Sequence, residues 1–166
     1  MAFDIVDFWK RQVEKWQTEN KCGFCWEFGA PLIDSQLNIE QTDEACCTYV
    51  FLTEIETSET PKFSTQTNFV NGKNCDTIFT LYVVRKGDLG TNNYSEIKGH
   101  PISESNWEKI FKPISDCLDC DLIIDFCELQ YGLKVDITQW RKTLEHAAFD
   151  NNYFGWKIRA NFRISQ

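Results

Sequence analysis

Cysteine is the residue type in this chain whose spacing best suits chemistry. Two pairs are separated by two residues each, Cys22 with Cys25 and Cys117 with Cys120. Four such thiolates can form a tetrahedral zinc site, and one pair at a helix N-terminus can form a redox dithiol. The spacing therefore raises two hypotheses, a zinc site built from Cys22, Cys25, Cys117 and Cys120 and a redox centre.

The residues around the first pair argue against both hypotheses. From Cys22 to Gly29, aromatic residues at every second position alternate with smaller ones, which predicts a strand. On a strand, Cys22 and Cys25 point to opposite faces and do not chelate one ion together. A redox pair also needs a strand before it and a helix after it, the reverse of the order predicted here. We interpret the cysteines as small buried hydrophobic residues and expect no metal and no cofactor.

The other candidates for catalysis carry no recognisable signature. Neither His100 nor His146 lies in a motif, which favours solvated side chains. The aspartates between residues 116 and 125 lack the spacing of a calcium loop, so we expect a solvent-exposed acidic face there. The sequence also lacks a phosphate-binding glycine loop and the common hydrolase motifs. We predict no catalytic residues and a protein that is not an enzyme.

The chain as a whole has the composition of one folded domain spanning residues 1–166. It is 42% apolar and 14% aromatic, enough for a sizeable core. Its net charge of -8 argues against nucleic-acid binding through phosphate neutralisation. It has no apolar run of membrane-spanning length, and the charged N-terminus does not resemble a signal peptide. We therefore expect a cytoplasmic site of synthesis, no membrane contact and reduced thiols.

The N-terminal half is predicted to form one helix and several strands. The helix begins after Asp4 and ends near Asn20, because apolar residues recur at helical spacing between them. Beyond the strand at 22–29, strands are predicted at 45–55 and 75–84. Two long polar connectors follow these strands, at residues 57–74 and 85–102.

The C-terminal half is predicted to add a second helix and further strands. This helix begins at Ser103 or Ser105 and ends near Leu118, with Pro113 kinking it. Residues 121–138 are then predicted to form a hairpin that turns at Tyr131 and Gly132, and residues 139–149 a short helix. The last strand, GWKIRANFRIS, alternates apolar and polar residues throughout. The predicted fold class is α+β, a mixed or antiparallel sheet with both helices packed on it.

The last strand carries a basic face in an otherwise acidic chain. Lys157, Arg159 and Arg163 point away from its apolar side. Together with the long connectors, this segregated charge makes these three residues candidates for a subunit interface with an acidic surface of a neighbouring copy. A solvated strand face is an equally consistent interpretation.

Four stretches of the chain carry a resemblance to a known group of proteins: CGFCWEFGAPL, EACCTYVFLTEI, KGDLGTNNYSEIKGHPISESNWEKIFKPI and DNNYFGWKIRANFR. In these stretches the chain resembles small virion structural proteins of crAss-like phages and related tailed phages of Bacteroides-type hosts. Its predicted order of elements is also similar to that of tail-terminator and head-tail joining proteins.

The resemblance implies a non-enzymatic subunit of a ring in the neck or tail of a virion, assembled in the host cytoplasm. The implied partners are copies of the chain itself, the portal or connector, and other tail ring or tube proteins. Phage DNA would pass through the central channel without specific binding, and an acidic wall would let it slide because the wall repels phosphate. The resemblance carries over no catalytic residues.

Two alternatives stay open from the residues alone. The paired cysteines leave a zinc-binding or redox domain as the first of them. The fold class alone leaves a small α+β domain that binds a ligand as the second.

Overall fold

The computed structural model describes residues 3–29, 47–63, 70–86, 111–146 and 153–165. Several predictions fall outside these ranges. They concern most of the second connector with His100, the start of the second helix before residue 111, and the end of the uncertain segment after residue 146.

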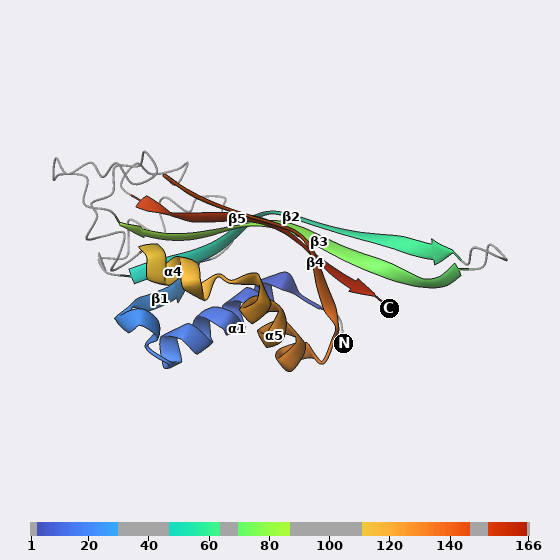
Figure 1. Cartoon of the computed structure of the whole chain (residues 1–166), viewed down its shortest axis with the longest axis horizontal. Coiled ribbons are helices and arrows are strands. Elements are labelled where there is room, and N and C mark those ends of the chain that lie inside the picture. The colour runs from blue at the N-terminus through green and yellow to red at the C-terminus, as the bar shows by residue number, and fades with distance from the viewer. Residues whose placement is uncertain (1–2, 30–46, 64–69, 87–110, 147–152, 166) are drawn as a thin grey trace.

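A mixed sheet forms one layer of the molecule and confirms the predicted α+β class (Figure 1). Its strands are β1 (Cys25–Phe28), β2 (Cys47–Phe63), β3 (Val70–Lys86), β4 (Val135–His146) and β5 (Tyr153–Ser165). They lie in the order β1-β2-β3-β5-β4. Only β1 and β2 run parallel, and the other neighbours are antiparallel.

The helices form a second layer on one face of this sheet (Figure 1). They are α1 (Ile5–Thr18), the short 3-10 helix η1 (Lys21–Gly23), α4 (Lys112–Cys117) and α5 (Cys120–Tyr131). Asp4 caps α1 as predicted, since its carboxylate accepts hydrogen bonds from the amides of Val6 and Asp7.

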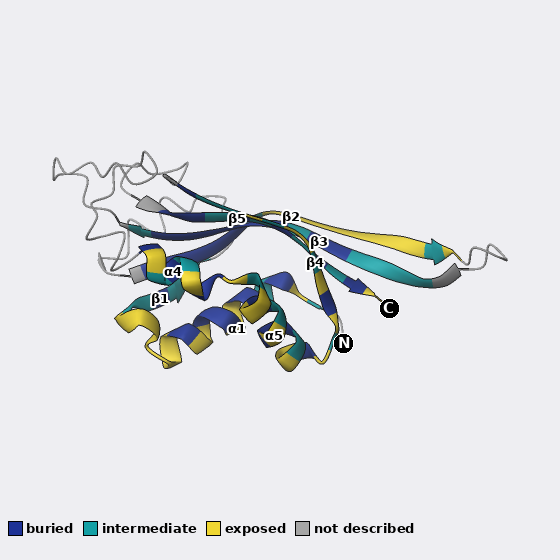
Figure 2. Ribbon diagram, in the orientation of Figure 1, coloured by how far each residue is buried: buried dark blue, intermediate teal, exposed yellow. Residues whose placement is uncertain are grey.

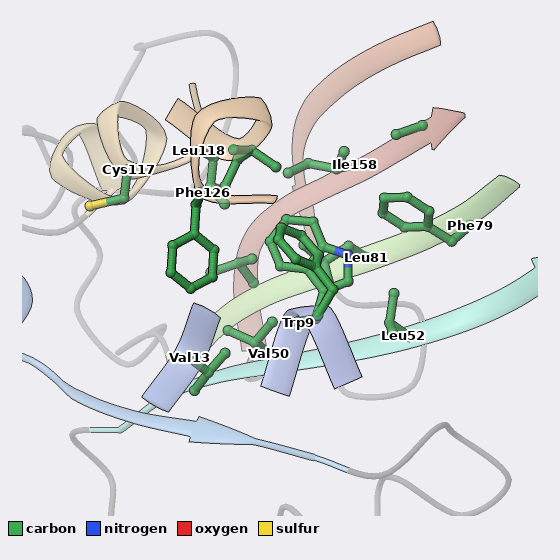
Figure 3. Close-up of a cluster of buried hydrophobic side chains, with 14 of the residues drawn as sticks. Trp9, Val13, Val50, Leu52, Phe79, Leu81, Cys117, Leu118, Phe126 and Ile158 are labelled. Carbon is green, nitrogen blue, oxygen red and sulfur yellow. The ribbon is translucent and has the colours of Figure 1, made fainter. Parts of the chain in front are cut away.

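The hydrophobic core fills the space between the two layers (Figure 2). Trp9 lies at its centre, fully buried, with its indole edge-on to the ring of Phe79 (Figure 3). The apolar face of the last strand contributes to this core as predicted. Its buried residues are Trp156, Ile158, Ala160, Phe162 and Ile164. The strand prediction for β5 is thereby confirmed, and so is the inward face of β3 at Phe79, Leu81 and Val83.

Strands β2 and β3 are longer than the sequence predicts. The segment 57–74 is predicted as a polar connector, but residues 57–63 continue β2 and residues 70–74 begin β3. The last pair between β3 and β5 joins Asn74 to Ser165, so the ends of β2 and β3 extend past the rest of the sheet (Figure 1). Polar residues suffice here because residues 54–63 of β2 are exposed apart from Lys62 and residues 72–75 of β3 are only half-buried (Figure 2).

The predicted hairpin over residues 121–138 is wrong in its first half. Residues 120–131 form α5, and only the second half is a strand, the start of β4. Ile123, Phe126 and Cys127 are buried at helical spacing. Gly132 ends the helix with a φ of 63°, which glycine adopts without a steric cost, so it is a helix cap and not a hairpin turn.

The short helix predicted for residues 139–149 is also wrong over its described part, because β4 extends to His146. A bulge shifts the pairing of β4 with β5 between Ile137 and Gln139. Because of the extra residue, the positions that face the core are odd-numbered before the bulge (Val135 and Ile137) and even-numbered after it (Trp140 and Leu144). This phase change conceals the alternation by which a strand is recognised.

Candidate functional site

The first cysteine pair does not lie on one strand as predicted. Strand β1 begins at Cys25, whereas Cys22 lies in η1 with a φ of 58°, in the left-handed region. Cys25 is disulfide-bonded. The expectation of reduced thiols is therefore wrong for Cys25. Cys22, Cys117 and Cys120 are free thiols.

The four cysteines of the zinc hypothesis do not form a common ligand set. Cys25 is committed to its disulfide and supplies no thiolate in this state. Within the described ranges, the one group of three possible ligands with their atoms inside 4.8 Å consists of Asp119, Cys120 and Asp121. Asp119 already caps α5 by accepting a hydrogen bond from the amide of Asp121 at 2.9 Å. Its neighbourhood is the exposed acidic face that the sequence predicts, and we assign no metal to it.

Two thiols from separate cysteine pairs do meet. The sulfur atoms of Cys22 and Cys117 lie 3.8 Å apart, although the residues are separated by 95 positions. Cys22 is exposed, and Cys117 is buried at the end of α4. Burial, reinforced by the neighbouring Cys22, raises the pKa of Cys117 to about 12. Sequence reasoning missed this contact because no local pattern reports a pairing over such a separation.

The basic residues of the last strand lie on the sheet face opposite the helices, among acidic and aromatic partners. Arg163 donates two hydrogen bonds to Asp76, at 2.8 and 3.1 Å. Arg159 reaches the carboxylate of Glu54 at 3.2 Å, and the ammonium of Lys157 lies 5.8 Å from the centre of the Tyr82 ring. All three candidates for a subunit interface thus have contacts within their own chain.

The ion pair between Arg163 and Asp76 shifts the pKa values of both side chains. The hydrogen bond from Arg163 holds the pKa of Asp76 below its usual value, against the opposing effect of burial. The same bond raises the pKa of Arg163. Both groups therefore stay charged at neutral pH, in a bidentate geometry that suits an arginine and a carboxylate.

A shallow groove of about 490 Å³ crosses this outer face of the sheet. Its charged lining residues are Glu54, Arg141, Lys157 and Arg159. Arg141 lies directly across from Arg159 on the neighbouring strand, a like-charge pair that is unfavourable on a sheet surface. Among the described residues, no carboxylate lies within ion-pair distance of Arg141. The sequence missed Arg141 because its segment was predicted as a helix.

Within the described ranges, both edges of the sheet are open over part of their length. Strand β4 ends the sheet on one side. On the other side, β1 pairs with β2 only from Cys47 to Val50. No further strand flanks residues 51–63 of β2 in the described part of the chain, and we call this stretch the distal β2 edge. Open edges present unpaired backbone donors and acceptors that another chain can meet.

The two edges differ in charge. The distal β2 edge carries Glu54, Glu56 and Glu59 against the single cation Lys62. The middle of β4 carries Arg141 and Lys142, between Asp136 and Glu145 nearer its ends. Arg141 lines the groove, whereas Lys142 lies on the helix side and donates a hydrogen bond to the Ser115 carbonyl at 3.1 Å. A bulge with a φ of 52° at Glu54 interrupts the β2 edge, and it turns that carboxylate onto the outer face toward Thr80 and Arg159.

No protein-family model matches the chain, and no curated protein is significantly similar to it in sequence. No helix in the described ranges is both long enough and apolar enough to span a membrane.

Proposed function

We propose that this chain is a structural subunit whose copies assemble head to tail into a ring. The observation that carries the proposal is the pair of open sheet edges in the described residues, the distal β2 edge with its three glutamates and the edge strand β4 with the unpaired cation Arg141 at its middle. A contact between two different surfaces of the same protein is heterologous, and it closes into a ring when the rotation per copy divides a full turn.

The directions of the strands fit such a contact. β2, β3, β5 and β4 alternate in direction across the sheet, so β4 runs antiparallel to β2. Suppose that β4 of one copy pairs with the distal β2 edge of the next copy and that the two sheets have the same orientation. The strands of the joined sheet then remain antiparallel across the contact. This pairing uses backbone hydrogen bonds for affinity and side chains for register.

The charges on the two surfaces add selectivity. The glutamates of the distal β2 edge would approach the side of the sheet that carries Arg141, Lys157 and Arg159. Arg159 already has the carboxylate of Glu54 beside it, whereas Arg141 has none within ion-pair distance among the described residues. Arg141 would therefore gain most from the glutamates of a neighbouring copy. This extends the predicted interface set Lys157, Arg159 and Arg163 by one residue.

On the resemblance to small virion proteins of crAss-like and related tailed phages, we further propose that this ring belongs to the neck or tail. Its partners there would be the portal or connector and other tail ring or tube proteins. The net charge of -8 suits a wall along which DNA slides without being held. The subunit has no catalytic role in this proposal.

The proposal is tested by the oligomeric state of the purified full-length chain. We expect cyclic oligomers in mass photometry and negative-stain images, formed by the chain alone or together with its partner ring. Attraction between unlike charges contributes to the contact between the edges. Glu56→Lys and Arg141→Glu should therefore each raise the protein concentration at half-assembly by at least about tenfold. The double variant should assemble at about the wild-type concentration, because the two charges are exchanged between the edges and still attract each other.

Asp125→Lys is the matched control, because it reverses an exposed charge on α5 in the helical layer. It should leave the midpoint of assembly unchanged. A protein that stays monomeric at all concentrations, with and without neck proteins, would contradict the proposal. Equal effects of all three charge reversals would show that net charge and not edge pairing controls assembly.

The zinc alternative is less consistent with the site than a structural role, because Cys25 is part of a disulfide. The ligand-binding alternative rests on the fold class alone, and two grooves of the described residues are open and lined largely by charged or polar side chains. Neither alternative explains the complementary edges.

A further inference from the structure

We propose that Cys22 and Cys117 form a dithiol site that reacts with small disulfide oxidants of the glutathione disulfide class and closes into a second disulfide. This site goes beyond the assembly role and does not depend on it. The proposal starts from the contact between their sulfur atoms, 3.8 Å apart. The two thiols belong to different elements, η1 and α4, so the bond would join two segments that are far apart in the chain but adjacent in the helical layer.

The surroundings give the two thiols different accessibility. Cys22 is exposed and open to a soluble oxidant. Cys117 is only 5% exposed and lies at the edge of the core cluster (Figure 3). Burial keeps Cys117 protonated at neutral pH by raising its pKa, which makes Cys22 the thiol that reacts first.

The backbone at Cys22 also departs from ordinary geometry. Its φ of 58° and ψ of 12° lie in the left-handed region, which is costly for residues other than glycine, asparagine and aspartate. Nearby, Asn20 shares a positive φ and Gly23 follows with a φ of 71°. This series of left-handed residues turns the chain after α1 and brings the Cys22 side chain to α4.

The reaction proceeds by two thiol–disulfide exchanges. The Cys22 thiolate attacks one sulfur of glutathione disulfide, which forms a mixed disulfide and releases one glutathione thiolate. Cys117 then loses its proton to solvent, and its sulfur attacks Cys22 Sγ and displaces the second glutathione thiolate. Two protein thiols are oxidised to one disulfide, and one glutathione disulfide is reduced to two glutathione molecules that take up the two protons.

The neighbouring chemistry is consistent with this site. Cys25, three positions after Cys22, is already disulfide-bonded. The remaining free thiols of the described residues are less suited to such a bond. They are Cys75, Cys120 and Cys127, and none of them has a sulfur contact with another free thiol.

The experiment is oxidation of the purified full-length protein with glutathione disulfide, followed by alkylation and chymotryptic peptide mapping under non-reducing conditions. Cleavage after Phe24 separates Cys22 from Cys25, and cleavage after Leu118 separates Cys117 from Cys120. We expect a peptide in which Cys22 is joined to Cys117. Because the bond closes a long loop, the melting temperature should rise by about 5 to 15 °C on oxidation.

Three variants make the result decisive. Cys22→Ser, at an exposed position, should lose both the joined peptide and the shift in melting temperature. Cys117→Ala should stop at the mixed disulfide of Cys22 with glutathione. Cys75→Ala removes a half-buried thiol elsewhere and should behave as the wild type. A stable mixed disulfide in the wild type, or a bond between Cys117 and Cys120, would overturn the proposal.

Discussion

At the scale of single residues, the closest fit in the sheet is at Gly155. This residue lies in β5 opposite Val84 of β3. A Cβ atom added to it would come within 2.7 Å of the Val84 Cα atom and would overlap the carbonyl oxygen of Val83. Both obstacles are backbone atoms, which do not move aside without disturbing the ladder between β3 and β5. Glycine is therefore required here by close approach of two strands.

Gly155→Ala should lower the free energy of unfolding by about 1 to 3 kcal/mol, because the added methyl group forces β3 and β5 apart. Urea unfolding followed by tryptophan fluorescence measures this change. Gly29→Ala is the control, since its new Cβ would lie an ordinary 3.6 Å from Phe51 Cβ. The control should stay within about 0.5 kcal/mol of the wild type. An equal loss of unfolding free energy at the two positions would contradict the explanation by close approach of β3 and β5 at Gly155.

The ion pair of Asp76 and Arg163 gives the fold a dependence on pH. The pKa of Asp76 is lower in the folded protein than in the unfolded chain, so folding favours its ionised form. The stabilisation is complete above the ordinary aspartate pKa of about 3.9. It is lost as the pH falls from there through the folded pKa.

Asp76→Asn should therefore be less stable than the wild type at neutral pH, and this difference should shrink as the pH falls below about 4. Urea midpoints measured from pH 7 to pH 2.5 provide the comparison. Asp125→Asn, an exposed aspartate, should show no such convergence. A difference between Asp76→Asn and wild type that stays constant to low pH would exclude the carboxylate as its source.

At the scale of elements, α5 is the helix that the sequence predicted as part of a hairpin. Its N-terminus is capped by Asp119, and its C-terminus ends at Gly132. The segment between them, DLIIDFCELQY, is apolar enough to suit a strand, and its helical period is weak because Leu122 and Leu129 are exposed. Burial of one side against α1 and the sheet selects the helix.

Asp119→Ala should lower the free energy of unfolding by about 1 kcal/mol, because the amide of Asp121 loses its hydrogen-bond acceptor. Asp125→Ala, further along the exposed side of the same helix, should change it by no more than about 0.5 kcal/mol. Chemical denaturation of both variants decides this. If the two substitutions lower the free energy of unfolding by the same amount, loss of the helix cap is not the cause.

At the scale of the whole molecule, the helices cover one face of the sheet (Figure 1). The opposite face is itself buried at Tyr49, Phe51, Tyr82 and Val84. Outside these buried positions, the charged groove and the described sheet edges are the surfaces left for contact with other copies. The basic groove and the distal β2 edge lie on this available part. The proposed ring thus uses surfaces that the core does not require.

The sequence predicted those elements whose pattern matches their burial. Helix α1 and strand β5 each have one apolar side that faces the core, and both were located from their periodicity. Strand β4 was missed because its bulge changes the phase of alternation. The extension of β2 and β3 was missed because it has no buried apolar face: its β2 part is exposed and residues 72–75 of β3 are half-buried. Alternation reports a strand only where one face is buried and the register is unbroken.

At the candidate site, the cysteines also show what the sequence predicted and what it missed. Their spacing raised the hypothesis of a four-thiolate zinc site, and the reasoning against it placed Cys22 on a strand that in fact begins at Cys25. The amino-acid sequence by itself determined the fold class, the core-facing strand β5 and the basic residues opposite it. Tertiary structure alone decided which distant groups meet, namely Cys22 with Cys117, Asp76 with Arg163 and Arg141 with Arg159. Periodicity reflects burial along one element, whereas these contacts depend on how separate elements pack against one another.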